Sequence, residues 1–195
     1  HGDLVEVIRT ARDRGIRVIV DLVVNHTSDQ HPWFKAARRS VDSPFRDFYV
    51  WRKDAPGNAK NEVFPGEEVS IWELDEKTGE YYLHSFYRHQ PDLNIANPRV
   101  RDEIAKTIGF WLQLGVSGFR VDAVPFLLEP PDGADLGDPH ELLRDLRRFL
   151  QRRSSEAILL GEVNLPYPEQ VEYFGGESGS ELTMQFDFVG MQALY

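Results

Sequence analysis

The sequence predicts an α/β fold in which parallel strands alternate with helices. Four short segments rich in apolar and β-branched residues have the composition of strands that are covered on both faces. Segments with apolar residues at helical spacing lie between them. Such alternation implies parallel strands that are joined by right-handed crossovers.

The first half of the chain contains two helix boundaries. Apolar residues at helical spacing predict a first helix that ends at Gly15, because glycine suits a helix C-terminus. A strand over 16–21 follows it directly. Asn97 and Pro98 read as an N-cap and a proline at the first helical position, and Gly115 ends that second helix.

The second half repeats the pattern. A capping-box-like start at Asp138–Glu141 predicts a helix between two strands, and a shorter helix around 168–174 precedes the last strand. We therefore expect four adjacent parallel strands, at about 16–21, 118–122, 158–162 and 183–187.

The spacing of the acids at the strand ends indicates how the sheet is built. Glu162 follows Asp122 by 40 residues and Asp187 follows Glu162 by 25, close to the roughly 31 residues per unit of a (β/α)₈ barrel. From Asp21 to Asp122 the distance is 101 residues, so a small domain is inserted there. The prediction is part of a (β/α)₈ TIM barrel, about strands 3 to 6, formed by 1–26 and 98–195, with the inserted domain at 27–97.

Composition excludes several classes of protein. The net charge of −10 argues against nucleic acid and anionic membranes as partners, and the absence of cysteine excludes disulfides and thiol nucleophiles. We see no apolar run of the roughly 18–20 residues that a membrane span needs. The chain starts at His1 without a leader-like segment, so we expect part of a longer protein and a cytoplasmic location.

Charged side chains collect where the strands end, and their spacing suggests chemistry. Arg120 and Asp122 are two residues apart on one strand, so their side chains face the same way. An adjacent arginine keeps a carboxylate ionised, as a nucleophile requires. Glu162, at the end of the next strand, could then donate a proton. One ionised and one protonated carboxyl group are what glycoside hydrolysis needs.

Four motifs occur in an order that makes a family resemblance explicit. They resemble successive sequence regions of the α-amylase superfamily of glycoside hydrolases (family 13), and the inserted segment resembles its domain B. The motifs are Asp21-Leu22-Val23-Val24-Asn25-His26, Gln90-Pro91-Asp92-Leu93-Asn94, Gly118-Phe119-Arg120-Val121-Asp122-Ala123 and Gly161-Glu162-Val163.

The resemblance implies roles for six residues. Asp122 resembles the catalytic nucleophile and Glu162 the general acid/base. Arg120 resembles the arginine that orients the nucleophile, and Asp21 the acid that supports this arginine. His26 resembles the histidine that binds the reacting sugar ring. Asn25 resembles a position that ligates structural calcium in many members, and the resemblance implies no other cofactor. The family's third catalytic carboxylate follows the seventh barrel strand and has no counterpart in these 195 residues, which we expect to be inactive alone.

The resemblance also suggests a substrate. The motif at 90–94 is typical of the branch that contains oligo-1,6-glucosidases, α-glucosidases and trehalose synthases, and the segments 25–34, 123–127 and 168–175 look most like trehalose synthase. Ala123, where α-1,6-specific members tend to carry Val, implies α-1,4 preference. The expected substrate is maltose or a short α-1,4-glucooligosaccharide, with isomerisation to trehalose or plain hydrolysis as alternatives. A non-catalytic amylase-like binding module is the other class, but such proteins lose the catalytic acids.

Overall fold

The structure is a computed structural model, which describes residues 2–54, 57, 59–60, 63–128 and 138–194. It contains two compact units, His1–Leu22 with Glu103–Tyr195, and Val23–Asp102. The second unit begins and ends a few residues outside the inserted segment 27–97 that the spacing of the strands predicts. Each unit is described by itself.

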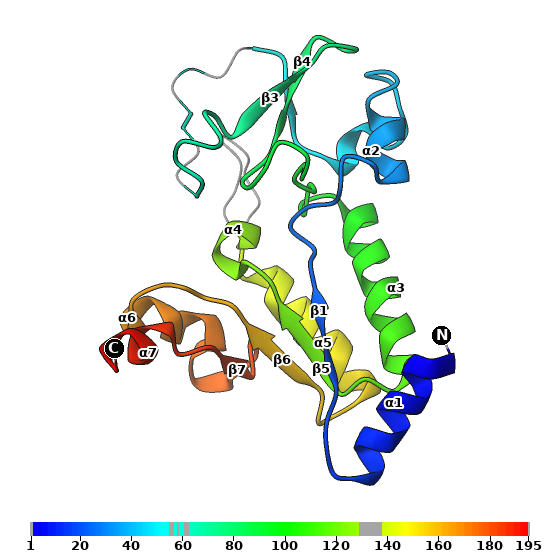
Figure 1. Ribbon diagram of the computed structural model, residues 1–195, viewed down its shortest axis with the longest axis vertical. Helices are drawn as coiled ribbons and strands as arrows, with labels where there is room; N and C mark the ends of the chain where they lie inside the picture. Colours follow the sequence, from blue (N-terminus) through cyan, green and yellow to red (C-terminus); the bar gives the residue numbers. More distant parts are fainter. Residues whose placement is uncertain (1, 55–56, 58, 61–62, 129–137, 195) are drawn as a thin grey trace. The chain divides into compact units, whose positions relative to one another are not determined.

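The first unit contains a parallel sheet of four strands (Figure 1). The strands are β1 (Ile19–Leu22), β5 (Gly118–Val121), β6 (Ile158–Gly161) and β7 (Met184–Gln185), and they pair in this order. The predicted α/β class, the four parallel strands and their adjacency are confirmed. The strands described here form an open sheet and do not close a barrel.

The strands are shorter than predicted, and the chain turns sharply after β5. Ala123 has a φ of 48°, in the left-handed region that residues with a Cβ rarely adopt. This turn ends the extended backbone just past Asp122. The helix α4 (Val124–Leu128), which the apolar run did not predict, follows it immediately.

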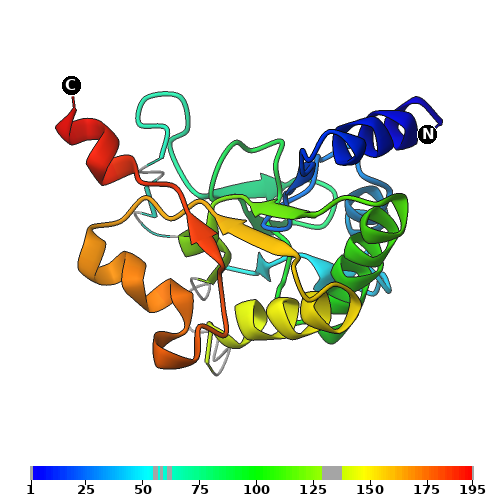
Figure 2. The same cartoon turned by 90° about the horizontal axis from the view of Figure 1, so that it is seen from below.

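Helices cover the first unit's sheet, and α5 (Glu141–Arg153) runs along one face of it (Figure 2). The contact is apolar: Leu143 and Leu150 of α5, Phe119 of β5 and Leu159 of β6 are completely buried. The other helices of this unit are α1 (Gly2–Asp13), the part of α3 (Pro98–Leu114) from Glu103 on, α6 (Tyr167–Gln170), α7 (Phe188–Ala193) and the short 3₁₀ helices η2 (Val171–Phe174) and η3 (Gly176–Ser178).

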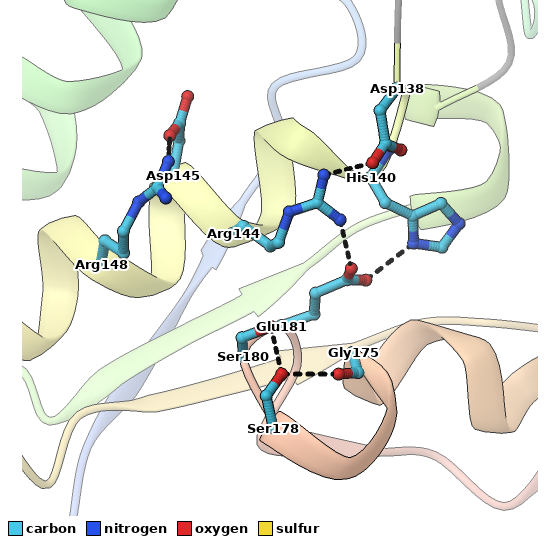
Figure 3. Close-up of polar contacts among 9 residues, drawn as sticks. All are labelled: Asp138, His140, Arg144, Asp145, Arg148, Gly175, Ser178, Ser180 and Glu181. Carbon is cyan, nitrogen blue, oxygen red and sulfur yellow. Dashed lines mark hydrogen bonds and ion pairs between the residues drawn. The ribbon is translucent and has the colours of Figure 1, made fainter.

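An ionic network joins the start of α5 to the segment before β7 (Figure 3). The buried carboxylate of Glu181 accepts hydrogen bonds from Arg144 at 3.0 Å and pairs with the Nδ1 atom of His140 at 2.7 Å. Arg144 also contacts Asp138. Asp138 accepts the backbone N–H of His140, the residue that caps α5, at 3.0 Å.

The second unit has a small antiparallel sheet in the order β2 (Trp51–Arg52), β4 (Glu80–Leu83), β3 (Trp72–Asp75). The helix α2 (Pro32–Ala37) and the 3₁₀ helix η1 (Arg46–Phe48) complete it. Aromatic side chains form its core, since Phe34, Phe48 and Tyr49 are buried. Among the described residues, no helix is both long and apolar enough to cross a membrane.

Candidate active site

The candidate site of the first unit is built around Arg120 in the middle of β5. Side chains alternate along a strand, so Phe119 and Val121, which are completely buried, face away from Arg120. Parallel pairing places Arg120 opposite Asp21 of β1 and Leu160 of β6. The carboxyl ends of three strands therefore bring their polar residues to one edge of the sheet.

The guanidinium group of Arg120 contacts three carboxylates. Its Nη1 atom lies 3.0 Å from Oδ1 of Asp122 and 3.3 Å from Oδ1 of Asp21. Its Nη2 atom donates to Oε2 of Glu162. The side chains of Asp122 and Glu162 are 24% and 31% exposed, so a ligand could reach both.

Backbone hydrogen bonds fix these carboxylates at the strand ends. The N–H of Glu162 donates to the carbonyl of Val121 at 3.0 Å, and the N–H of Val124 donates to the carbonyl of Glu162 at 3.1 Å. The bond from Val124 is possible because the chain turns at Ala123. The turn thus connects Val124, two residues after Asp122, to Glu162 at the end of β6.

Arg120 remains charged in this environment. Burial lowers the pKa of its guanidinium group, but the three surrounding carboxylates outweigh this effect and raise the pKa above its ordinary value. A permanent positive charge therefore lies between Asp122 and Glu162.

Glu162 has the electrostatics of a proton donor. Burial raises the pKa of its carboxyl group, Arg120 lowers it, and the negative charge of Asp122 and a hydrogen bond with Asp122 raise it again. The net direction is upward.

One aromatic contact of the site was not predicted from the sequence. The ring of Phe186, directly after β7, lies with its centroid 5.9 Å from the guanidinium carbon of Arg120. Its neighbour Asp187, the expected acid at the end of the fourth strand, is not among the contacts of Arg120 that the structure shows. Asp187 instead accepts the N–H of Gly190 at 2.7 Å, and so caps α7.

The other two predicted site residues, Asn25 and His26, belong to the second unit. His26 forms an isolated antiparallel bridge with Asp92, a residue of the motif at 90–94. The side-chain nitrogen of Asn25 lies 3.4 Å from Oδ1 of Asp92 and 3.5 Å from Nδ1 of His26. Asp92 lies in the motif at 90–94, but the sequence predicted no role for this residue.

Asp92 is a buried acid with an unusual pKa. Only 4% of its surface is exposed, and burial raises the pKa of its carboxyl group to about 7. Hydrogen bonds from the hydroxyl and backbone N–H of Ser85 and from Asn25 oppose this rise. These donors stabilise the ionised form in a place where no cation is in contact among the described residues.

The surroundings of Asn25 do not fit a calcium ion well. Calcium takes six to eight oxygen ligands, whereas the contacts of Asn25 are made through its NH₂ group, a donor. The one carboxylate beside it, Asp92, is already bonded to Ser85. The described residues contain no cluster of three or more His, Asp or Glu side chains that could hold a metal. Calcium binding at Asn25 stays a prediction.

Comparison with known proteins gives a consistent family. The family described as alpha amylase, catalytic domain, matches residues 1–195. The trehalose synthase of Pimelobacter sp. (strain R48) is 44% identical over 195 residues, which cover 95% of this chain and 34% of that protein. The oligo-1,6-glucosidase of Parageobacillus thermoglucosidasius is 38% identical, with coverage of 97% of this chain and 37% of that protein.

Solved structures of similar proteins agree with the fold. The trehalose-6-phosphate hydrolase of Bacillus licheniformis superposes with a TM-score of 0.84, at 32% identity, over 100% of this chain and 37% of that one. A variant of the trehalulose synthase MutB, in complex with sucrose, gives a TM-score of 0.82 at 33% identity, over 96% and 36%. The chain thus spans about a third of the length of the relatives it matches.

Proposed function

The chain belongs to the alpha amylase catalytic domain family, and from this we propose that the protein cleaves α-glucosidic bonds with retention of configuration. Asp122 is the nucleophile and Glu162 the general acid/base in this proposal. The observation that carries it is the contact of both carboxyl groups with the single guanidinium group of Arg120.

The geometry favours retention over inversion. Retaining enzymes hold their two carboxyl groups about 5–5.5 Å apart, whereas inverting enzymes need about 6.5–9.5 Å to admit a water molecule. The contact of both carboxyl groups with one guanidinium group supports the shorter separation.

The proposed reaction has two steps. Asp122 attacks the anomeric carbon while Glu162 protonates the glycosidic oxygen, so the bond to the leaving sugar breaks and a glycosyl ester forms. Glu162 then removes a proton from the acceptor, whose oxygen displaces Asp122. Arg120, in contact with Asp122, orients this carboxylate in the first step and supports its release in the second.

We propose maltose or a short α-1,4-glucooligosaccharide as the substrate. The relatives named trehalose synthase support glucosyl transfer, in which the released glucose is the acceptor and trehalose the product. The relatives named glucan 1,6-alpha-glucosidase and oligo-1,6-glucosidase support the alternative, hydrolysis with water as the acceptor. The choice depends on how well water is excluded from the glycosyl-enzyme.

One incubation separates these outcomes. The protein, expressed from its complete reading frame, is incubated with maltose, and separately with isomaltose, and trehalose and glucose are resolved by chromatography. We expect turnover of maltose above isomaltose, and loss of at least about 10³-fold in kcat for Asp122→Asn. Asp145→Asn, in an exposed ion pair on α5, serves as the matched control with full activity. Turnover that survives Asp122→Asn contradicts the proposal.

A further inference from the structure

The second unit contains a chain of polar contacts that ends at His26. It runs from Ser85 through Asp92 and Asn25 to the imidazole ring. Backbone bonds hold the two segments together, since the N–H of Leu93 donates to the carbonyl of Asn25 at 2.8 Å. Asn25 and Asp92 are each only 4% exposed, so these contacts are shielded from water.

The direction of each hydrogen bond follows from chemistry. Above its pKa of about 7 the carboxyl group of Asp92 has no proton to give, so it accepts the hydroxyl and the backbone N–H of Ser85, the latter at 3.1 Å. The remaining contact of Oδ1 is with the Nδ2 atom of Asn25 at 3.4 Å, which donates one of its two hydrogens.

The second hydrogen of the Asn25 amide is available to His26. Nδ2 of Asn25 also lies 3.5 Å from Nδ1 of His26. An amide nitrogen can only donate, so Nδ1 must be the acceptor, and in neutral imidazole the proton is then on Nε2. The ring is also held by Phe86, with centroids 5.3 Å apart.

We propose that Ser85, Asp92 and Asn25 are positioning residues that fix His26 in its Nε2-protonated tautomer, so that Nε2–H is presented to a hydroxyl group of the sugar. The role of His26 toward sugar rests on the proposed function, but the tautomer does not. In this proposal Asn25 acts through its NH₂ group rather than as an oxygen ligand of a metal.

The tautomer can be observed directly. Long-range ¹H–¹⁵N correlation spectra of the full-length protein, labelled with ¹⁵N-histidine, distinguish a protonated from a bare ring nitrogen. The spectra are recorded at pH 8, where Asp92, whose pKa is about 7, is ionised, and His26→Gln assigns the signal. We expect Nδ1 bare and Nε2 protonated. A proton on Nδ1 in the unmodified protein overturns the proposal.

Variants test whether the chain sets the tautomer. Ser85→Ala should give a mixture of the two tautomers, and Ser85→Thr, which keeps the hydroxyl group, should not. Asn25→Leu removes the donor to Nδ1 and should also give a mixture of the two tautomers. The spectra of the unmodified protein keep the test decisive where neither variant folds. The matched control is Ser70→Ala. The hydroxyl group of Ser70 lies outside this chain of contacts and accepts the N–H of Trp72 at 3.0 Å.

Steady-state kinetics show whether Ser85 affects activity through His26. Ser85→Ala should lower kcat/KM on maltose roughly tenfold, the value of one net hydrogen bond. In a His26→Ala background the same change should cause no further loss. Losses that add in the double variant would show a merely structural role for Ser85 and overturn the proposal. Absence of all activity would count against the proposed function alone, because the spectra test the tautomer independently.

Discussion

The Nη1 atom of Arg120 lies 3.0 Å from Oδ1 of Asp122, the residue two positions further along the chain. The same guanidinium group donates to Glu162 from its other terminal nitrogen. Arg120 therefore stabilises negative charge on either carboxyl group, so the raised pKa of Glu162 must have another source. That source is the burial of Glu162 and its contact with Asp122, which raise the pKa of Glu162. The proton assignment of the site depends on this balance.

Replacing Arg120 by lysine should lower kcat/KM by at least about 100-fold. Lysine keeps the charge, but a point-like ammonium group cannot reach three carboxylates with the planar geometry of a guanidinium group. Steady-state kinetics on maltose measure the effect. Arg148→Lys, in an exposed pair with Asp145, should keep full activity. Equal rates for Arg120→Lys and the unmodified protein would mean that the contacts of Arg120 are dispensable.

The alkaline limb of the pH profile should belong to Glu162. A general acid must be protonated, and the raised pKa of Glu162 keeps it so above the ordinary range of a carboxyl group. We expect kcat/KM to fall as the pH rises through this pKa. Glu162→Gln should have much lower activity and lose this limb, which kcat/KM measured between pH 4 and 9 would show.

The raised pKa of Glu162 also makes stability depend on pH. Between the ordinary pKa of Glu162, 4.5, and its raised value in the folded protein, the folded state binds more protons than the unfolded state. Stability therefore falls as the pH rises through this window. Denaturant unfolding should show a shallower fall for Glu162→Gln than for the unmodified protein, and an unchanged slope would contradict the assignment.

Ala123 should be a position where glycine stabilises the protein. Its φ of 48° costs an L-residue roughly 1–2 kcal/mol, and glycine avoids this cost. We expect Ala123→Gly to raise the free energy of unfolding by about 1 kcal/mol and Ala123→Val, with its branched Cβ, to lower it. Denaturant titrations of the three proteins decide the order. Equal stability of Gly and Val variants would argue against strain at this turn.

Replacing two glycines of the first unit by alanine should change stability in opposite directions. A Cβ at Gly118 of β5 would lie 2.1 Å from the carbonyl oxygen of Ile158, so Gly118→Ala must push β5 and β6 apart. A Cβ at Gly109 in α3 would meet nothing closer than Phe149, at 4.0 Å. Gly109→Ala should therefore stabilise the helix by about 0.5–1 kcal/mol. Thermal melts of both variants test the contrast.

The fold could be predicted because its signals are local. The apolar runs and caps predicted four parallel strands in their order, and the residues at the strand ends identified Arg120 and its carboxylates. The turn at Ala123 and the helix after it were missed. Apolar residues continue through this segment, so composition alone gives no sign that the backbone leaves the extended conformation.

The contacts between residues that are distant along the chain also could not be predicted from the sequence. Phe186 contacts Arg120, and Ser85 contacts Asp92, only because the folded chain brings each pair together. A serine before an aromatic residue carries no signal for a buried acid seven positions later. The roles of Asp122, Glu162 and His26 remain predictions that the variants above test.

Glu181 should be the most costly charged residue to replace in the network that joins α5 to the segment before β7. Its side chain is 3% exposed and bonds to both His140 and Arg144, so removing the carboxylate leaves two donors without this acceptor. Arg144 is 30% exposed and keeps Asp138 as a partner, which limits the loss.

We expect Glu181→Gln to lower the free energy of unfolding by about 1–3 kcal/mol. The amide keeps the shape but loses the charge and one acceptor. The exposed pair of Asp145 and Arg148 on the same helix (Figure 3) provides the control. Because water screens such pairs, Asp145→Asn should leave the melting temperature unchanged. Denaturant titration of both variants measures the difference. Equal effects would mean that burial adds nothing to the contacts of Glu181, and that α5 is held to the sheet by its leucines alone.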